Sequence, residues 1–250
     1  MKTVAQKTAA LDPRAGDRLP YAGHLDDHTV MTRSGDLIQM IQVDGVAFET
    51  ADSETLNHMA AVRDVVMRGI ANSNLMLYCH VIRRQVTAEL SGAQPEGFVR
   101  DLDDAWQQQL RGKMLYINDM VLMLVRRPAQ GKIGFFDRLT KWGNGTRNSA
   151  ERLADQAREL RELEAARTNL LSSLTRYGPR LLGRYRGAGG VCSEPLEILS
   201  AMYNGEMQPV LEPTGDAGHY LPYKRISFGL DALELKGASA NTSRFGAIVS

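Results

Sequence analysis

The 250-residue chain lacks the features that mark secreted, disulfide-stapled or membrane-spanning proteins. Its two cysteines, Cys79 and Cys192, lie far apart, which excludes a disulfide framework and a cysteine-based metal site and is typical of a reducing compartment. The longest uninterrupted apolar run is Met120–Val125, far short of the ~20 residues that a membrane-spanning helix needs. Residues 1–18 start basic but contain no continuous apolar stretch of the signal-peptide kind, so we expect a flexible leader there.

The chain also lacks a strong net charge and a phosphate-binding loop. Its net charge is +1, which gives no reason to expect nucleic-acid binding. A P-loop requires a glycine-rich turn, then Gly-Lys followed by Ser or Thr. The two Gly-Lys pairs are followed by Met114 and Ile133, which have no hydroxyl group for a metal ion. We therefore expect no cofactor in this chain and no hydrolysis of ATP by this chain alone.

The histidines and cysteines suggest one weak catalytic hypothesis. Cys79 and His80 are adjacent, so a small enzyme that uses this pair is conceivable. Neighbouring residues of a strand point to opposite faces, however, and this favours a hydrogen-bonded core histidine. We expect Cys79 to be buried and inert, and we expect no metal site because no histidine has a partner at metal-ligand spacing.

The most informative stretch predicts a β-hairpin that leads into a helix. Two strands, at His28–Arg33 and Asp36–Val43, are separated by Ser34-Gly35, and glycine accepts the positive φ of a tight turn. Both faces of the second strand are mostly apolar, which predicts a central strand covered on both sides. Asp52 or Ser53 is a suitable N-cap for the next helix.

Hydrophobic periodicity predicts four more elements up to residue 128. They are an amphipathic helix at Ser53–Ile70, a central strand at Leu75–Arg84, a helix from Phe98 to about Gly112, and a buried strand at Met120–Arg126. The order strand–strand–helix–strand–helix–strand predicts an α+β domain over residues 19–128, with a mixed or antiparallel sheet and the helices packed on one face.

The second half is predicted to begin with a linker and a long helix. Residues 129–147 are read as a linker with a small aromatic anchor at Phe135 and Phe136. A helix is expected from Asn148 to Tyr177, where Asn148 and Glu151 resemble a capping box. Leucines at heptad spacing form a seam along it, which must be buried either against the domain body or against a partner.

Residues 148–250 as a whole are predicted to hold this helix and the start of a second, small α/β part. The sequence ends on an apolar strand-like segment, so we expect this part to be truncated at its C-terminal end. Its other expected elements are a short strand at Arg180–Arg186, a helix capped by Ser193 and ending at Asn204-Gly205, and strands at Ile226–Leu235 and Arg244–Ser250.

Two arginine pairs give the first candidate binding site. Arg83 with Arg84, and Arg126 with Arg127, each end a predicted strand. If those strands are parallel neighbours, four guanidinium groups gather at one end of the sheet and can bind a phosphate, a lipid headgroup or an acidic partner. The alternative is that they are ordinary solvated strand ends.

Several sequence blocks resemble a known family. The block TVMTRSGDLIQMIQVDGVAFETAD, after Leu-Pro-Tyr, is similar to the N-terminal region of the CagE/TrbE/VirB type IV secretion and conjugal-transfer ATPases, the fourth component of the VirB set. Later blocks agree in the same order, and the resemblance covers roughly Asp17 to Ser250. They are NLMLYCHVIRR, LYINDMVLMLVRRP, LTRYGPRLL, PLEILSAMYNG and RFGAIVS.

This resemblance implies a large cytoplasmic ATPase, peripheral to the bacterial inner membrane. In the family the motor, with its ATP and Mg²⁺, lies C-terminal to the region seen here. This region anchors the motor beside the small inner-membrane subunits of the secretion machine and helps it to form homo-oligomers. We expect partner contacts at exposed apolar residues that lie in predicted loops, namely Leu19, Pro20, Tyr21, Phe135 and Phe136. The alternative function is a free-standing α+β scaffold or binding module.

Overall fold

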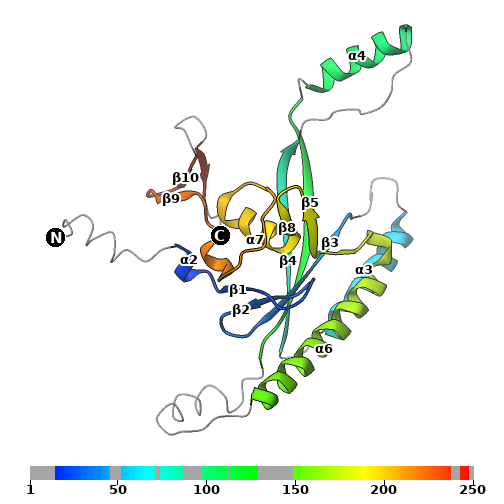
Figure 1. The fold of residues 1–250 in the computed structure, drawn as a ribbon. Coiled ribbons are helices and arrows are strands. Elements are labelled where there is room, and N and C mark those ends of the chain that lie inside the picture. Colours follow the sequence, from blue (N-terminus) through cyan, green and yellow to red (C-terminus); the bar gives the residue numbers. More distant parts are fainter. Residues whose placement is uncertain are drawn as a thin grey trace, which may run out of the picture.

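The structure is a computed structural model that describes residues 15–45, 52–70, 74–86, 97–111, 113–128, 149–237 and 243–247. The expected linker with Phe135 and Phe136, the first 14 residues of the expected leader, and the proposed cap Asn148 all lie outside these ranges. Helices and antiparallel sheets make up the described chain, so the predicted α+β class is confirmed (Figure 1).

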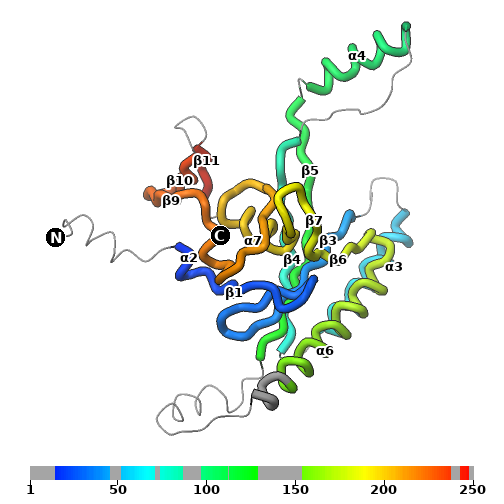
Figure 2. Tube along the Cα trace, in the orientation of Figure 1, coloured from blue at the N-terminus to red at the C-terminus, as the bar shows by residue number. Residues whose placement is uncertain are grey.

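One antiparallel sheet forms the body of the protein. Its strand order is β1-β2-β3-β5-β4, and a sixth strand, β6, pairs with the free end of β3 beside β2 (Figure 2). The strands are β1 (Tyr21–His24), β2 (Val30–Thr32), β3 (Leu37–Val43), β4 (Leu75–Val86), β5 (Leu115–Arg126) and β6 (Arg180–Leu181).

The predicted hairpin is present at β2 and β3. Gly35 has a φ of 91°, as the turn requires, and the amide of Thr32 donates a hydrogen bond of 2.9 Å to the carbonyl of Asp36. All residues of β3 except Gln42 are buried, so the prediction of a central, doubly covered strand is confirmed. β3 is central because β2 and β6 pair with one edge and β5 with the other, and both faces are covered because Met40 lies in one core cluster and Ile41 in the other.

One face of the sheet is covered by helices α3 (Ser53–Ile70) and α6 (Ser149–Ser173), which run side by side (Figure 1). Asp52 caps α3, because its carboxylate accepts a hydrogen bond from the amide of Thr55. The leucine seam of α6 packs against this face, and Leu163 and Leu170 are fully buried in one cluster with Ile41 of β3. Of the two alternatives for the seam, the structure therefore selects packing against the domain body.

The opposite face is covered by helix α7 (Glu194–Asn204). Ser193 is its N-cap and Gly205, in the left-handed region, is its C-cap, as the sequence predicts. Leu196 of α7 is fully buried in a second cluster that includes Val30 and Met40 of the sheet. The part of the chain after the long helix thus completes the core of the first domain.

Strand β4 lies at the edge of the sheet, which corrects the expectation of a central strand. It pairs with β5 along all 12 residues, from Leu75 opposite Arg126 to Val86 opposite Leu115. Its apolar run resembles that of a central strand, but β5 lies between β4 and β3. Pairing between β3 and β5 ends at Met120, so the rest of the β4–β5 hairpin projects beyond the sheet.

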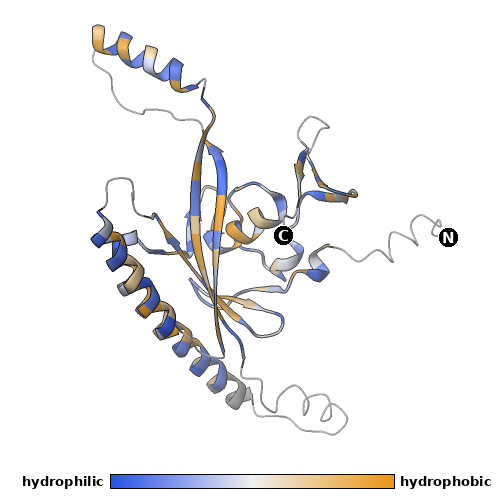
Figure 3. Ribbon diagram, turned by 180° about the vertical axis from the view of Figure 1, so that it is seen from behind, coloured by the Kyte–Doolittle hydropathy of each residue, from blue (hydrophilic) through white to orange (hydrophobic). Residues whose placement is uncertain are grey.

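At the end of this projection lies helix α4 (Phe98–Arg111), which does not pack on the sheet as expected and buries none of its residues (Figures 1 and 3). The hairpin carries it away from the body. We call residues Ile82–Val86, Leu115–Asp119 and α4 together the arm.

The remaining elements are short. Part of the expected leader, Ala15–Arg18, forms helix α2, and Arg180–Arg186 is split between β6 and β7 rather than forming one strand. The expected strand at Ile226–Leu235 is instead a hairpin, because a turn closes where the amide of Gly229 donates to the carbonyl of Ala232. These elements are β7 (Arg184–Gly187), β8 (Gly190–Ser193), β9 (Arg225–Phe228), β10 (Leu233–Lys236), β11 (Arg244–Gly246) and the 3-10 helices Thr175–Tyr177 and Ala217–His219.

Candidate docking interface

The two arginine pairs lie at opposite ends of the β4–β5 hairpin. The strands are antiparallel, so Arg83 is opposite Asn118, whereas Arg126 is opposite Leu75 at the other end. The condition for a cluster of four guanidinium groups, parallel neighbouring strands, is therefore not met.

Three of the four arginines have partners within the chain. Arg126 is buried and pairs with Glu162 of α6. Arg84 pairs with Asp119 across the hairpin, and the guanidinium of Arg83 lies 4.8 Å from the centre of the Tyr116 ring. Arg127 is exposed, and no carboxylate of the described residues lies within ion-pair distance of it.

The Leu19-Pro20-Tyr21 segment forms the start of the sheet and not the expected exposed loop. Tyr21 is the first residue of β1 and pairs with Thr32 of β2. Leu19 and Tyr21 are half-buried against the core cluster that contains Met40, and only Pro20 is exposed. Of this part of the expected interface, Leu19 and Tyr21 therefore pack against the domain core, and only Pro20 is fully accessible to a partner.

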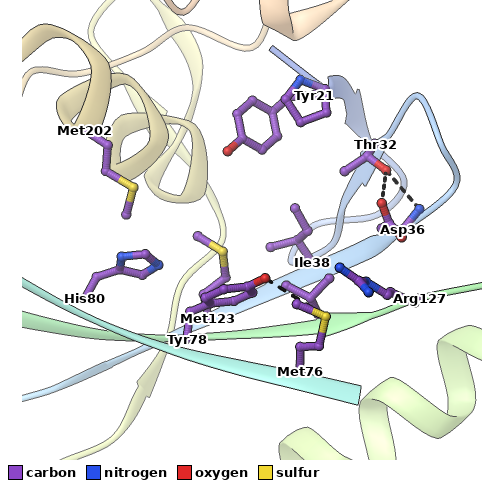
Figure 4. Close-up of a pocket in the computed structure, with 12 residues that line it drawn as sticks. Tyr21, Thr32, Asp36, Ile38, Met76, Tyr78, His80, Met123, Arg127 and Met202 are labelled. Carbon is purple, nitrogen blue, oxygen red and sulfur yellow. Dashed lines mark hydrogen bonds between the residues drawn. The ribbon is translucent and has the colours of Figure 1, made fainter. Parts of the chain in front are cut away.

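A pocket of about 280 Å³ opens between β1, the edge strand β4 and helix α7 (Figure 4). Its walls combine apolar side chains, three of them methionines, with a few polar groups. The lining residues are Pro20, Tyr21, Thr32, Asp36, Ile38, Met76, Tyr78, His80, Met123, Val125, Arg127 and Met202. The volume lies at the lower limit of small-molecule sites, about 300 Å³, and suits a side chain better than a cofactor.

The polar groups left free in this pocket are mainly donors. The Asp36 carboxylate already accepts hydrogen bonds from the hydroxyls of Thr32 and Ser34. Burial raises the pKa of the Tyr21 phenol, which keeps it protonated as a donor. Arg127 adds a positive charge to the lining of the pocket (Figure 4). The pocket can therefore accept an apolar group together with a carboxylate or carbonyl oxygen.

His80 lies in the wall of the pocket, below Met202 in Figure 4. Burial lowers the pKa of His80, so its ring is neutral at pH 7. Its Nε2 atom is buried and has no hydrogen-bond partner among the described residues. A buried polar atom of this kind costs free energy until a partner satisfies it.

The Cys79–His80 enzyme hypothesis gains no geometric support. Cys79 is exposed, which corrects the expectation that it is buried, and the reason is that β4 is an edge strand. Successive residues of β4 face opposite sides of the sheet, so the thiol and the imidazole do not converge. Among the described residues, no three His, Cys, Asp or Glu side chains are grouped to hold a metal ion.

A serine–histidine contact elsewhere is structural. The hydroxyl oxygen of Ser193 lies 2.6 Å from Nε2 of His24, whose Nδ1 lies 3.0 Å from the carbonyl of Asp26. Ser193 is 0% exposed and its hydroxyl also accepts the amide of Leu196 as the cap of α7. A buried capping serine cannot reach a substrate, so this contact fixes α7 to β1.

Comparison with known proteins shows which family the chain is similar to. Residues 28–133 match the N-terminal domain of the type IV secretion system ATPase VirB4/TrbE. The resemblance found in the sequence is confirmed.

Curated relatives extend the similarity over most of the chain. The type IV secretion system protein virB4 of Bartonella henselae is 29% identical over 227 residues, which cover 89% of this chain and 28% of the relative. The virB4 protein of Brucella melitensis is 28% identical over 229 residues, covering 89% and 27%. Protein virB4 of Agrobacterium tumefaciens is 29% identical over 222 residues, covering 87% and 27%. The chain thus spans less than a third of the length of these relatives.

The family match includes most of the candidate interface. The matched residues 28–133 contain β2 to β5 with the edge strand and the arm, whereas Tyr21 and Met202 of the pocket lie outside the match. Within the described ranges, no helix has both the length and the apolar character needed to cross a membrane.

Sequence reasoning found part of this interface. It singled out Pro20, Tyr21 and Arg127, which the fold brings together in one pocket. It missed Met76 and Met202, which come from distant parts of the chain. The sequence signal that could have indicated this pocket is the alternation of Met76, Tyr78 and His80 on one face of the strand.

Proposed function

We propose that this chain is the N-terminal anchoring and assembly region of a type IV secretion ATPase. It docks the motor to the inner-membrane part of the secretion machine, beside other subunits of that machine, and supports the formation of homo-oligomers. In this proposal the protein is cytoplasmic and peripheral to the bacterial inner membrane. ATP and Mg²⁺ bind, and ATP is hydrolysed, in a C-terminal part outside this chain. The family match and the relatives support this reading over that of a free-standing scaffold.

The observation that carries the proposal is the apolar surface of the arm. Phe98, Leu102 and Trp106 follow each other at intervals of four residues on α4, so they share one face of the helix. All three side chains are exposed, Trp106 at 55%. An amphipathic helix usually buries such a face against its own core. Exposed apolar patches mark interaction sites, so we assign α4 to contacts with other subunits or with a second copy.

The arginines and the N-terminal segment remain candidate contacts in this proposal. Arg127, Pro20 and Tyr21 line the pocket, and Leu19 packs against the same core cluster as Tyr21. Arg83 and Arg84 lie on the arm. Arg126 acts indirectly, because it is buried against α6. Phe135 and Phe136 remain proposed contacts from the sequence.

Two measurements on the full-length ATPase test the proposal in cells that make the whole machine. Deletion of residues 1–250 should leave ATP hydrolysis measurable but prevent co-sedimentation with inner membranes. The double change Leu102→Ala and Trp106→Ala should reduce oligomer mass or membrane co-sedimentation, because it removes the apolar face of α4. The matched control is Gln108→Ala, an exposed change on the same helix away from that face. If the deletion variant still sediments with membranes and keeps its oligomer mass, the proposed function is wrong.

A further inference from the structure

We propose that the outer edge of β4 binds an extended segment of a partner protein as an additional strand. The segment places a large apolar side chain in the pocket and a carboxylate near Arg127. This inference rests on the proposed docking function and specifies the chemistry of the partner. The occupant is a strand from another subunit, with alternating apolar residues and an acidic residue.

The first support is the unpaired backbone of β4. All 12 residues of this strand pair with β5, without a bulge, and no described strand pairs with the other side. Natural edge strands are protected by brevity, proline, charged residues, bulges or a covering element. The segment Leu75–Ile82 contains no proline, lysine, arginine, aspartate or glutamate. An edge of this length without such protection fits a strand that pairs in the assembled machine.

The second support is the position of the pocket beside this edge. Met76, Tyr78 and His80 alternate along β4, so they face the same side of the sheet, and all three line the pocket. A strand added to β4 would lie ~4.8 Å away and would point its alternate side chains to that same side. One of these side chains can therefore enter the 280 Å³ pocket from the edge.

The third support is charge, which also favours a strand of another subunit over a second copy of this chain as the occupant. Arg127 at the rim of the pocket has no ion pair among the described residues, and the Tyr21 hydroxyl is a donor. Pairing of β4 with β4 of another copy would bring two more arginines, Arg83 and Arg84, and no carboxylate, because β4 contains no acidic residue. A strand that carries a carboxylate complements this site, whereas a second β4 does not.

The test uses the full chain and synthetic peptides of about seven residues that alternate threonine with phenylalanine, valine and glutamate. Peptides are made in both chain directions, and hydrogen exchange of the β4 amides is followed as peptide is added. Binding should slow exchange along Leu75–Ile82. In a β-ladder only alternate amides of the added strand point toward β4. N-methylation of one alternate set should therefore weaken binding about tenfold or more, and N-methylation of the other set should have little effect.

The side-chain part of the inference is tested with variants. Arg127→Ala should weaken binding of the glutamate peptide about tenfold, and should not affect a peptide with glutamine in place of glutamate. Arg111→Ala on α4 is the matched control, because it removes an exposed arginine away from the pocket. Thermal melting of each variant checks that it is folded.

The results of these experiments either support or overturn strand addition at β4. Protection of β4 that depends on one alternate set of amides and on Arg127 supports the inference. Absence of binding by every peptide, or binding that is equally sensitive to both methylation patterns, overturns it. Self-association of the chain that protects β4 without peptide identifies a second copy as the occupant and also overturns it. If no peptide binds but membrane co-sedimentation still depends on residues 1–250, the docking function stands and strand addition is wrong.

Discussion

The guanidinium of Arg126 and the carboxylate of Glu162 lie 2.6 Å apart, and they join the end of β5 to the long helix α6. Arg126 is 4% exposed, whereas Glu162 is 46% exposed. The guanidinium donates to this carboxylate and to the backbone carbonyl of Arg127, and the carboxylate is its charged partner in place of water.

Removal of Glu162 should destabilise the protein more than removal of a neighbouring glutamate. In Glu162→Ala the buried Arg126 loses its charged partner, and we expect the unfolding free energy to fall by about 1–3 kcal/mol, since Glu162 is only half-buried. Glu164→Ala is the matched control, because the Glu164 carboxylate makes no ion pair in the described part of the chain. Urea denaturation measures both variants. Equal midpoints for the two would contradict the assignment.

The seam of α6 should contribute to stability through its buried leucines. Leu163→Ala creates a cavity among β3, β5 and α6, and such substitutions lower the unfolding free energy by about 2–5 kcal/mol. Leu160→Ala, at a partly buried seam position, should cost clearly less. Thermal melting compares the two variants. A larger loss for Leu160 than for Leu163 would show that the seam packs against something other than the sheet.

Stability should increase with pH across the range in which His24 changes charge. Burial is the main cause that lowers the pKa of His24 from 6.5, and the neutral ring can accept the Ser193 hydroxyl hydrogen bond. Below pH 6.5 the unfolded chain binds more protons than the folded protein, so the stability contribution present above 6.5 is lost as the pH falls toward the folded pKa. His80, whose pKa is also lowered by burial, contributes with the same sign.

Urea midpoints measured from neutral pH down to about pH 5 check this expectation. The His24→Gln variant should show a shallower pH dependence than the unmodified chain. His58→Gln, a change on the exposed side of α3, is the control. If stability rises as the pH falls through this range, then burial does not lower the pKa of His24.

The two cysteines should differ in reactivity. Cys79 is exposed on the edge strand, whereas Cys192, in β8, is buried at 3% exposure. A maleimide reagent should therefore add one label to the folded chain and a second after unfolding in urea. Mass spectrometry of proteolytic fragments locates each label. Rapid labelling of Cys192 in the folded chain would contradict its burial in β8.

Local signals in the sequence predicted the elements whose structure depends on neighbouring residues. Gly35 marked the hairpin turn, Asp52 marked the start of α3, and Ser193 with Gly205 marked both ends of α7. Each of these depends on one backbone conformation or one short hydrogen bond, which a few residues determine.

The features that the sequence did not predict depend mostly on how segments far apart in the chain are arranged. The apolar run of Leu75–Ile82 is the same whether β4 lies at the centre or the edge of the sheet, because periodicity does not specify strand order. The stripe of α4 predicts burial but does not say against which chain. The pocket joins Tyr21, Met76 and Met202, which are brought together only by the complete fold.

The continuous pairing of β4 with β5 has a mechanical consequence. The same two strands that form one edge of the core extend without interruption into the arm that carries α4. A force applied at α4 therefore acts on two hydrogen-bonded strands whose other ends lie inside the sheet, next to β3 and the Arg126–Glu162 pair. If a subunit bound to the arm tilts, the paired strands would transmit the torque to the sheet and to the packing of α6, which a loop could not do.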